Sequence, residues 1–320
     1  MSKHRIATIF AGALVALAPE MAAAQMPTDI AFKTGESWTH SSSGIVVPPT
    51  LGGSPRFNGK IIIGPDLDVS VGFGGPGRDA ITFFIFRDTT GSVPIWMAQS
   101  QTAILLDKKQ AWATPVPPMS FTPPGQAANS GLKMVYVPQG HKTITATGIA
   151  IFAVNGWYVK MRMTSFGKSP AAVSAIMESA LHEIRFPAPT RALGPVRPIA
   201  DCPSKLTFGT AADSKASPSV LTTGITSAAP TLRAALWCRD TTLESNRAVY
   251  RPSGMSDRYL LAVGDNGNGV SVLPQAGYYS SNFYTAKNIF TLVAQDKMPS
   301  PQRILALING SRTVAVTPNP

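Results

Sequence analysis

Three residues of the chain are candidates for hydrolytic chemistry: His141, His182 and Ser165. A histidine acts as a general base only when the fold brings it within hydrogen-bond reach of a nucleophile such as a serine hydroxyl. The sequence contains no H-E-x-x-H, G-x-S-x-G or P-loop spacing that would place such groups together. A hydrolase with dispersed catalytic residues therefore stays an alternative, and we predict no catalytic residue, no metal and no cofactor.

Short matches to known motifs fail when their context is considered. Gly72–Gly77 fits G-x-G-x-x-G, but the next expected element is a strand, and phosphate binding needs a helix N-terminus there. Ser165–Lys168 and Lys33–Gly35 fit the S-x-x-K and K-T-G motifs of penicillin-recognising serine enzymes, but in the reverse order. Asp265–Gly269 offers oxygen ligands for Ca²⁺, yet Ala276 stands where an EF-hand loop needs glutamate. We interpret the glycine-rich segment and the Asp265 segment as turns.

A cationic stripe is the main candidate for binding. Tyr158, Lys160 and Arg162 alternate with apolar residues, and side chains along a strand point to opposite faces in turn. The three side chains are therefore expected on one face, where they could bind an anion. The other interpretations are a solvated sheet face and a face paired to carboxylates.

The elements that must position these residues alternate between strand and helix. A helix is expected at Pro94–Leu106, and a second one follows the N-cap Ser169 and Pro170, whereas residues 113–131 are proline-rich and are expected to form a loop. Asn155-Gly156 is a two-residue hairpin signal. The expected strands are Asp66–Val71, Ile81–Arg87, Lys133–Val137, Thr143–Ala153 and Tyr158–Thr164. This order predicts an α+β fold, an antiparallel sheet flanked by helices.

Part of this layout resembles known proteins. The segment Val69–Arg87, the hairpin Asn155–Arg162 and the amphipathic helix after Ser169 look like a group of uncharacterised exported bacterial proteins. The layout is also similar to the Mog1/PsbP fold, over about residues 30–187. The resemblance implies an accessory or binding role rather than catalysis.

The second half of the chain is expected to be a smaller, mostly-β domain. Prolines between Pro187 and Pro198 favour a linker, which places the domains at residues 25–195 and 196–320. A short helix is expected from Pro301 to Ile308, ended by Gly310 in a left-handed conformation. The expected strands are Leu232–Cys238, Ala248–Arg251, Tyr259–Gly264, Val270–Leu273, Ile289–Gln295 and Thr313–Val316.

Residues 1–24 are typical of a secretory signal peptide. Lys3 and Arg5 precede an apolar run from Ile6 to Ala18, and small residues up to Ala24 form the cleavage pattern. The run of about 13 residues would extend roughly 20 Å as a helix, too short to span a bilayer. We therefore expect a periplasmic or secreted protein, cleaved near Ala24, without a transmembrane anchor.

Export agrees with the cysteine content and the charge. The two cysteines, Cys202 and Cys238, are expected to form a disulfide in an oxidising compartment. The net charge is +11, or +10 without residues 1–24, which favours an anionic envelope component or an envelope protein as partner. The basic residues are scattered, so nucleic acid is not an expected partner.

We expect a non-enzymatic envelope protein with a binding or assembly role. A small-ligand carrier is a further alternative, and it predicts an apolar pocket between the domains.

Overall fold

The fold is mostly β. The computed structural model describes residues 26–75, 77–105, 111–113, 118–141, 143–216 and 236–319, so the expected signal peptide lies outside the described residues. Strands account for 42% of the described residues and helices for only 14%. The α+β class that we expected from the sequence is therefore wrong, because the sheets extend through segments that the sequence patterns left unassigned.

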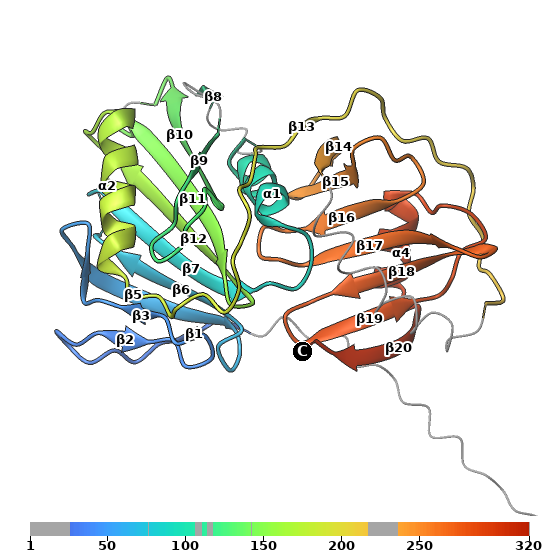
Figure 1. Ribbon diagram of the computed structural model, residues 1–320, viewed down its shortest axis with the longest axis horizontal. Coiled ribbons are helices and arrows are strands. Elements are labelled where there is room, and N and C mark those ends of the chain that lie inside the picture. Colours follow the sequence, from blue (N-terminus) through green and yellow to red (C-terminus); the bar gives the residue numbers. More distant parts are fainter. Residues whose placement is uncertain are drawn as a thin grey trace, which may run out of the picture.

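The first sheet has ten strands in the order β1-β5-β6-β7-β12-β11-β10-β8, with β4 on β5 and β9 on β10 (Figure 1). All of its pairings are antiparallel. Its strands are β1 (Thr28–Asp29), β4 (Thr50–Leu51), β5 (Ser54–Ile63), β6 (Asp68–Phe73), β7 (Ala80–Arg87), β8 (Ala111–Ala113), β9 (Met119–Phe121), β10 (Gly131–Gln139), β11 (Ala146–Val154) and β12 (Trp157–Ser165). A separate hairpin pairs β2 (Trp38–Thr39) with β3 (Val46–Val47).

The second sheet has eight strands that follow one another in chain order. Only the pairing of β13 with β14 is parallel. Its strands are β13 (Ala200–Asp201), β14 (Trp237–Leu243), β15 (Arg247–Pro252), β16 (Tyr259–Val263), β17 (Gly269–Gln275), β18 (Tyr278–Tyr284), β19 (Asn288–Leu292) and β20 (Thr313–Pro318). The disulfide between Cys202 and Cys238 is confirmed, and it links the segment after β13 to β14.

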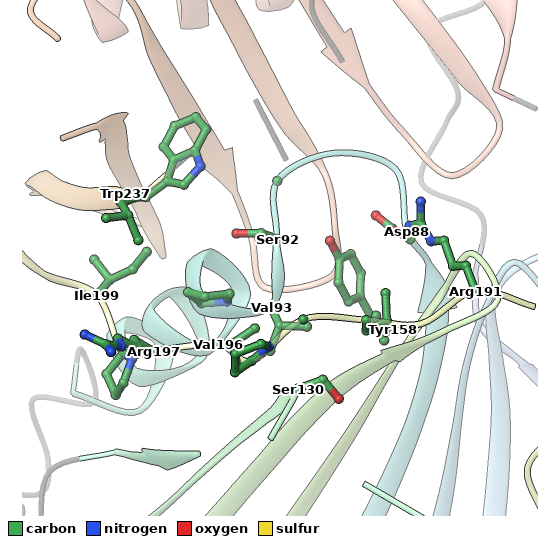
Figure 2. Close-up of a pocket in the computed structure, with 18 residues that line it drawn as sticks. Asp88, Ser92, Val93, Ser130, Tyr158, Arg191, Val196, Arg197, Ile199 and Trp237 are labelled. Carbon is green, nitrogen blue, oxygen red and sulfur yellow. The ribbon is translucent and has the colours of Figure 1, made fainter. Parts of the chain in front are cut away.

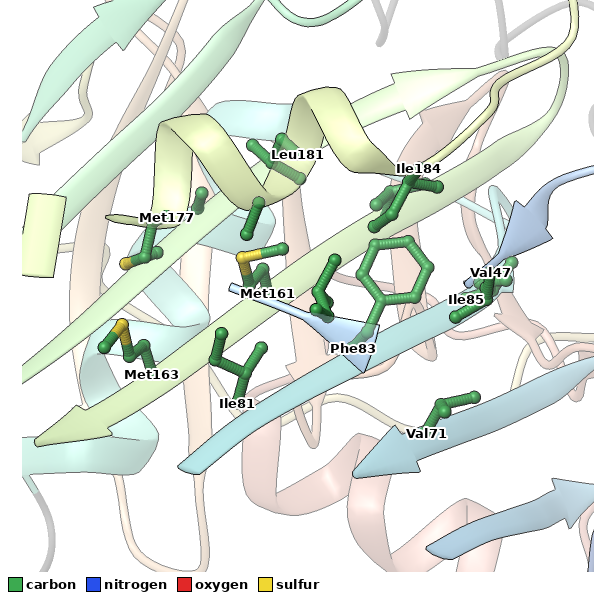
Figure 3. Close-up of a cluster of buried hydrophobic side chains, with 14 of the residues drawn as sticks. Val47, Val71, Ile81, Phe83, Ile85, Met161, Met163, Met177, Leu181 and Ile184 are labelled. Carbon is green, nitrogen blue, oxygen red and sulfur yellow. The ribbon is translucent and has the colours of Figure 1, made fainter. Parts of the chain in front are cut away.

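Three helices complete the described structure. Helix α2 (Pro170–Glu183) covers one face of the first sheet, where Phe83, Met161 and Met177 belong to one buried cluster (Figure 3). Helix α1 (Val93–Leu105) lies between the two sheets (Figure 1), and its Trp96 packs in a cluster with residues of both. Helix α4 (Pro301–Asn309) packs on the second sheet. None of the described helices has the length and apolar character needed to cross a bilayer.

Local signals explain where several elements begin and end. The Ser169 side chain accepts a hydrogen bond from Ala172 N at 3.2 Å, which confirms the predicted N-cap of α2. Asn155 and Gly156 both take positive φ and close the β11–β12 hairpin. At the end of α4 the prediction is wrong: Gly310 has φ −85°, and Ser311 takes the left-handed conformation instead.

Candidate functional site

A cavity of about 480 Å³ lies where the linker crosses the junction of the two sheets (Figure 2). Its walls come from the start of α1, from the strands β11 and β12, from the linker and from the start of β14. The lining residues are Asp88, Gly91, Ser92, Val93, Pro94, Ser130, Ala153, Tyr158, Arg191, Leu193, Gly194, Pro195, Val196, Arg197, Pro198, Ile199, Leu236 and Trp237. Most of them are apolar, which is typical of small-molecule sites.

The linker forms its wall because hydrogen bonds hold it to the first sheet. At one end, Asn155 Oδ1 accepts from Thr190 N at 2.8 Å, and Asn155 Nδ2 donates to Ala188 O at 2.9 Å. Further along, Val196 N donates to Asn129 O at 2.9 Å. Proline in this stretch favours extended backbone that does not fold back into a helix. The linker is therefore fixed at two points across the mouth of the cavity.

Few polar groups line the cavity, and they lie at distinct places. Arg191 and Asp88 are at one end, and Arg197 is at the other (Figure 2). Both arginines are exposed. The Ser92 hydroxyl is buried and has no hydrogen-bond partner among the described residues. The cavity therefore offers a ligand two exposed guanidinium groups, one at each end, rather than a buried polar cluster.

The predicted cationic stripe lies on one face of β12, as the alternation predicts, but its three side chains have different surroundings. Tyr158 is buried in the cavity wall, with its ring 5.6 Å from that of Phe86. Lys160 is also buried, and its Nζ lies 2.7 Å from Asp265 Oδ2 in the β16–β17 connection. Arg162 is exposed. Of the interpretations, pairing to a carboxylate describes Lys160, while anion binding by the stripe stays a prediction.

A second carboxylate lies close to this ion pair. Asn266 Nδ2 donates to Asp68 Oδ2 at 3.1 Å, so Asp68 on β6 is also joined to the β16–β17 connection. Burial raises the pKa of Asp68 to about 6, although the hydrogen bond from Asn266 and the charge of Lys160 oppose the shift. Burial also disfavours ionisation of Asp265, but Lys160 outweighs it and keeps the pKa of Asp265 below its usual value.

The three residues considered for hydrolysis make separate, local contacts. Ser165 is fully buried, and its hydroxyl donates to Asp79 Oδ1 at 2.7 Å. His141 Nδ1 accepts from Ile144 N at 2.9 Å within its own loop. His182 is exposed on α2. No hydrogen bond within the described ranges joins any two of the three.

A different histidine and serine do meet, although no motif in the sequence pointed to them. His40 Nδ1 lies 2.7 Å from Ser43 Oγ in the β2–β3 turn, and His40 Nε2 lies 2.7 Å from the Asp66 carbonyl oxygen. Because Ser43 N also donates to Nδ1, the neutral tautomer with its proton on Nε2 fits these contacts. The signal in the sequence was His40 three residues before Ser43, a spacing that a turn closes.

The geometry around His40 favours a structural role. The His40 ring is 0% exposed and lies edge-on to the Trp157 ring at 4.8 Å. Burial lowers the pKa of His40, even though the Asp66 carbonyl and carboxylate act in the opposite direction. Ser43 Oγ accepts a hydrogen bond from Ile45 N, which stabilises the turn. Neither His40 nor Ser43 lines the cavity.

The chain matches no protein-family model. A search of the curated proteins likewise found no match. The resemblance to the Mog1/PsbP fold therefore stays a prediction, and the function is argued from the site alone.

Proposed function

We propose that this chain is a non-enzymatic, exported binding protein that holds a small amphipathic anion in the cavity beneath the linker. This joins the expected binding role to the expected pocket of a small-ligand carrier. The observation that supports it is the cavity itself: its volume of about 480 Å³ falls within the roughly 300–1,000 Å³ typical of small-molecule sites.

The lining indicates the chemistry of the ligand. Apolar side chains such as Val93, Ile199 and Trp237 favour an apolar or aromatic body. Arg197 stands at the end away from Asp88, so an anionic group fits best at that end (Figure 2). A guanidinium binds carboxylate, sulfonate or phosphate oxygens through charge-assisted hydrogen bonds.

A matched pair of probes tests this proposal. 8-Anilinonaphthalene-1-sulfonate and N-phenyl-1-naphthylamine share an aromatic body, but only the first has an anionic group. A fluorescence titration of the protein without residues 1–24 should give one saturable site per chain, which prefers the sulfonate. Absence of saturable binding by either probe would overturn the proposal.

Two arginine variants locate the anionic end of the site. Arg197→Ala should weaken binding of the sulfonate about tenfold, because one charge-assisted hydrogen bond contributes roughly 1.5 kcal/mol or more. It should leave binding of the neutral probe nearly unchanged. Arg162→Ala is the matched control, since Arg162 is exposed on β12 and does not line the cavity. If Arg162→Ala alone weakened binding, the anion site would be the cationic stripe instead.

A hydrolase is the second candidate, with His40 and Ser43 in place of the residues expected from the sequence, because His40 Nδ1 and Ser43 Oγ have the contact of a base and a nucleophile. A screen with p-nitrophenyl esters of short acids, using Ser43→Ala as the comparison, separates the two functions. Turnover that disappears in Ser43→Ala would favour the enzyme. If wild type and Ser43→Ala hydrolyse the esters at the same background rate, the contact between His40 and Ser43 only stabilises the turn.

A further inference from the structure

The last strand of the second sheet has an unusual edge. Strand β20 ends the sheet order, so in the described part of the chain its outer side pairs with no strand. Its residues Thr313–Pro318 include no charged side chain. Free sheet edges are usually protected by lysine, by other charges or by a covering segment, because an open edge can pair with another chain. The protective features of this strand are Pro318, at the very end, and a register shift beside Val314.

The exposed side chains of β20 continue an apolar row of the sheet. Val316 is 48% exposed and Val314 is 39% exposed. Val316 is paired with Phe290, Phe290 with Phe283, and Phe283 with Val270. Val270 is buried in the cluster beneath α4, whereas the row becomes progressively more exposed towards β20. The apolar face of the sheet therefore stops at an open edge rather than at a polar boundary.

The sequence of this edge strand is palindromic, so two copies paired antiparallel place like residues opposite each other. Residues 313–317 read Thr-Val-Ala-Val-Thr in both directions. If two copies pair antiparallel with Ala315 on the two-fold axis, each Val314 faces a Val316 and each Thr313 faces a Thr317. Valine pairs then lie on one face and threonine pairs on the other. Matched β-branched and threonine pairs are among the favourable cross-strand combinations.

From this we propose that β20 is the docking edge for a second copy of the same chain, and that the two second sheets join across a two-fold axis at Ala315. A self-complementary patch is what a two-fold interface requires, because each copy contributes the same surface. A register shift between Thr291 and Leu292 leaves Val314 without a partner on β19, but exposure still alternates along β20. A five-residue edge is smaller than a standard interface, so the dimer should dissociate on dilution.

Cysteine cross-linking tests the position of the axis. Residues opposite each other in a non-hydrogen-bonded antiparallel pair have Cα atoms about 4.5 Å apart, which suits a disulfide. The chain has two cysteines and both are in the native disulfide, so a new cysteine has only its copy to react with. Ala315→Cys should form a covalent dimer under mild oxidation at high protein concentration. Ser311→Cys, four residues from the axis on the preceding turn, should not.

The mass in solution supplies an independent measurement. Sedimentation of the protein without residues 1–24 should show a monomer–dimer equilibrium that shifts to dimer as concentration rises. Val316→Lys should shift the midpoint at least tenfold higher, because it places two like charges at the interface. Phe57→Lys is the control, since Phe57 is 62% exposed on β5 of the other sheet. A monomer at every concentration, or equal cross-linking of both cysteine variants, would overturn the proposal.

Discussion

Lys160 on β12 and Asp265 in the β16–β17 connection form an ion pair, with 2.7 Å between Nζ and Oδ2, that joins the first sheet to the second. Lys160 Nζ also donates to the Asp265 carbonyl oxygen at 3.0 Å and lies 4.7 Å from the centre of the Phe84 ring. The Lys160 side chain is almost fully buried, whereas that of Asp265 is one-third exposed. The residue that the sequence suggested as an external anion binder therefore contacts an anion of the protein itself.

Removing this lysine should weaken the association of the two sheets. Lys160→Met keeps most of the unbranched apolar stem but leaves Asp265 without its counter-charge. We expect the free energy of unfolding to fall by about 2 kcal/mol, below the roughly 3–5 kcal/mol of a fully buried pair, because water reaches Asp265. Urea unfolding of Lys160→Met, Asp265→Asn and the double variant measures the coupling. If the two single effects simply add, the ion pair does not stabilise the fold.

The carboxyl group of Asp68 should make stability depend on pH between about 4 and 6. Its pKa is about 6 in the folded protein and about 3.9 in an unfolded chain. Between these values the folded state binds more protons, so the free energy of unfolding falls as pH rises. The predicted fall is about 2–3 kcal/mol in total, and it levels off at about pH 7, one unit above the pKa of the folded state.

Asp68→Asn removes this titration and keeps an oxygen that can accept from Asn266. The difference in free energy of unfolding between wild type and Asp68→Asn should therefore change steadily from pH 4 to pH 6, with the variant relatively more stable at pH 7. Taking the difference at each pH cancels the contributions of His40 and of the other titrating groups that both proteins share. Asp29→Asn, at an exposed carboxylate paired to Lys60, is the control. A difference in free energy of unfolding that is constant over this range would show that the pKa of Asp68 is not raised.

The disulfide should contribute measurably to stability. Cys202 and Cys238 are 36 positions apart, and closing a loop of this length in the unfolded chain corresponds to about 3–4 kcal/mol. The double variant Cys202→Ser/Cys238→Ser should lose about that much free energy of unfolding in urea. Wild type unfolded with and without a reducing agent is the matched comparison. A loss below about 1 kcal/mol would show that the bridge does not constrain the unfolded chain.

Export can be tested by the mass of the processed protein. Expression of the full chain in a Gram-negative bacterial host should give a periplasmic product that begins at Gln25, because the small residues before it suit the cleaving peptidase. Intact-mass spectrometry of the periplasmic fraction measures this directly. A product that stays in the cytoplasm with its N-terminus complete would contradict the signal peptide.

Much of the secondary structure was predictable because local patterns agree with the fold. The helices after Ser169 and Ser300 follow from a capping serine and proline at the first turn. The strand β5 was missed because Pro55 and Gly59 interrupt its pattern. The strand β18 was missed because Ser280 and Ser281 interrupt its apolar residues. These two omissions, and the loop assigned over β9, lowered the expected strand content.

The cavity could not be predicted, because no local pattern encodes it. Arg191 and Arg197 appeared only as residues of a proline-rich linker, and their importance depends on Asn155 and Asn129 holding that linker across the sheet junction. The cationic stripe was predictable as one face of β12. The carboxylate that pairs with Lys160 was not, since Asp265 lies 105 residues further along the chain. Contacts of that kind arise only when the two sheets meet.

A crystal structure of the complex with 8-anilinonaphthalene-1-sulfonate is the most direct test of the proposed ligand site. The proposed site should hold one probe molecule between the linker and the start of α1, with its aromatic rings against Ile199 and its sulfonate at Arg197. An empty cavity at saturating concentration of the probe, or a probe bound only at Arg162, would contradict it.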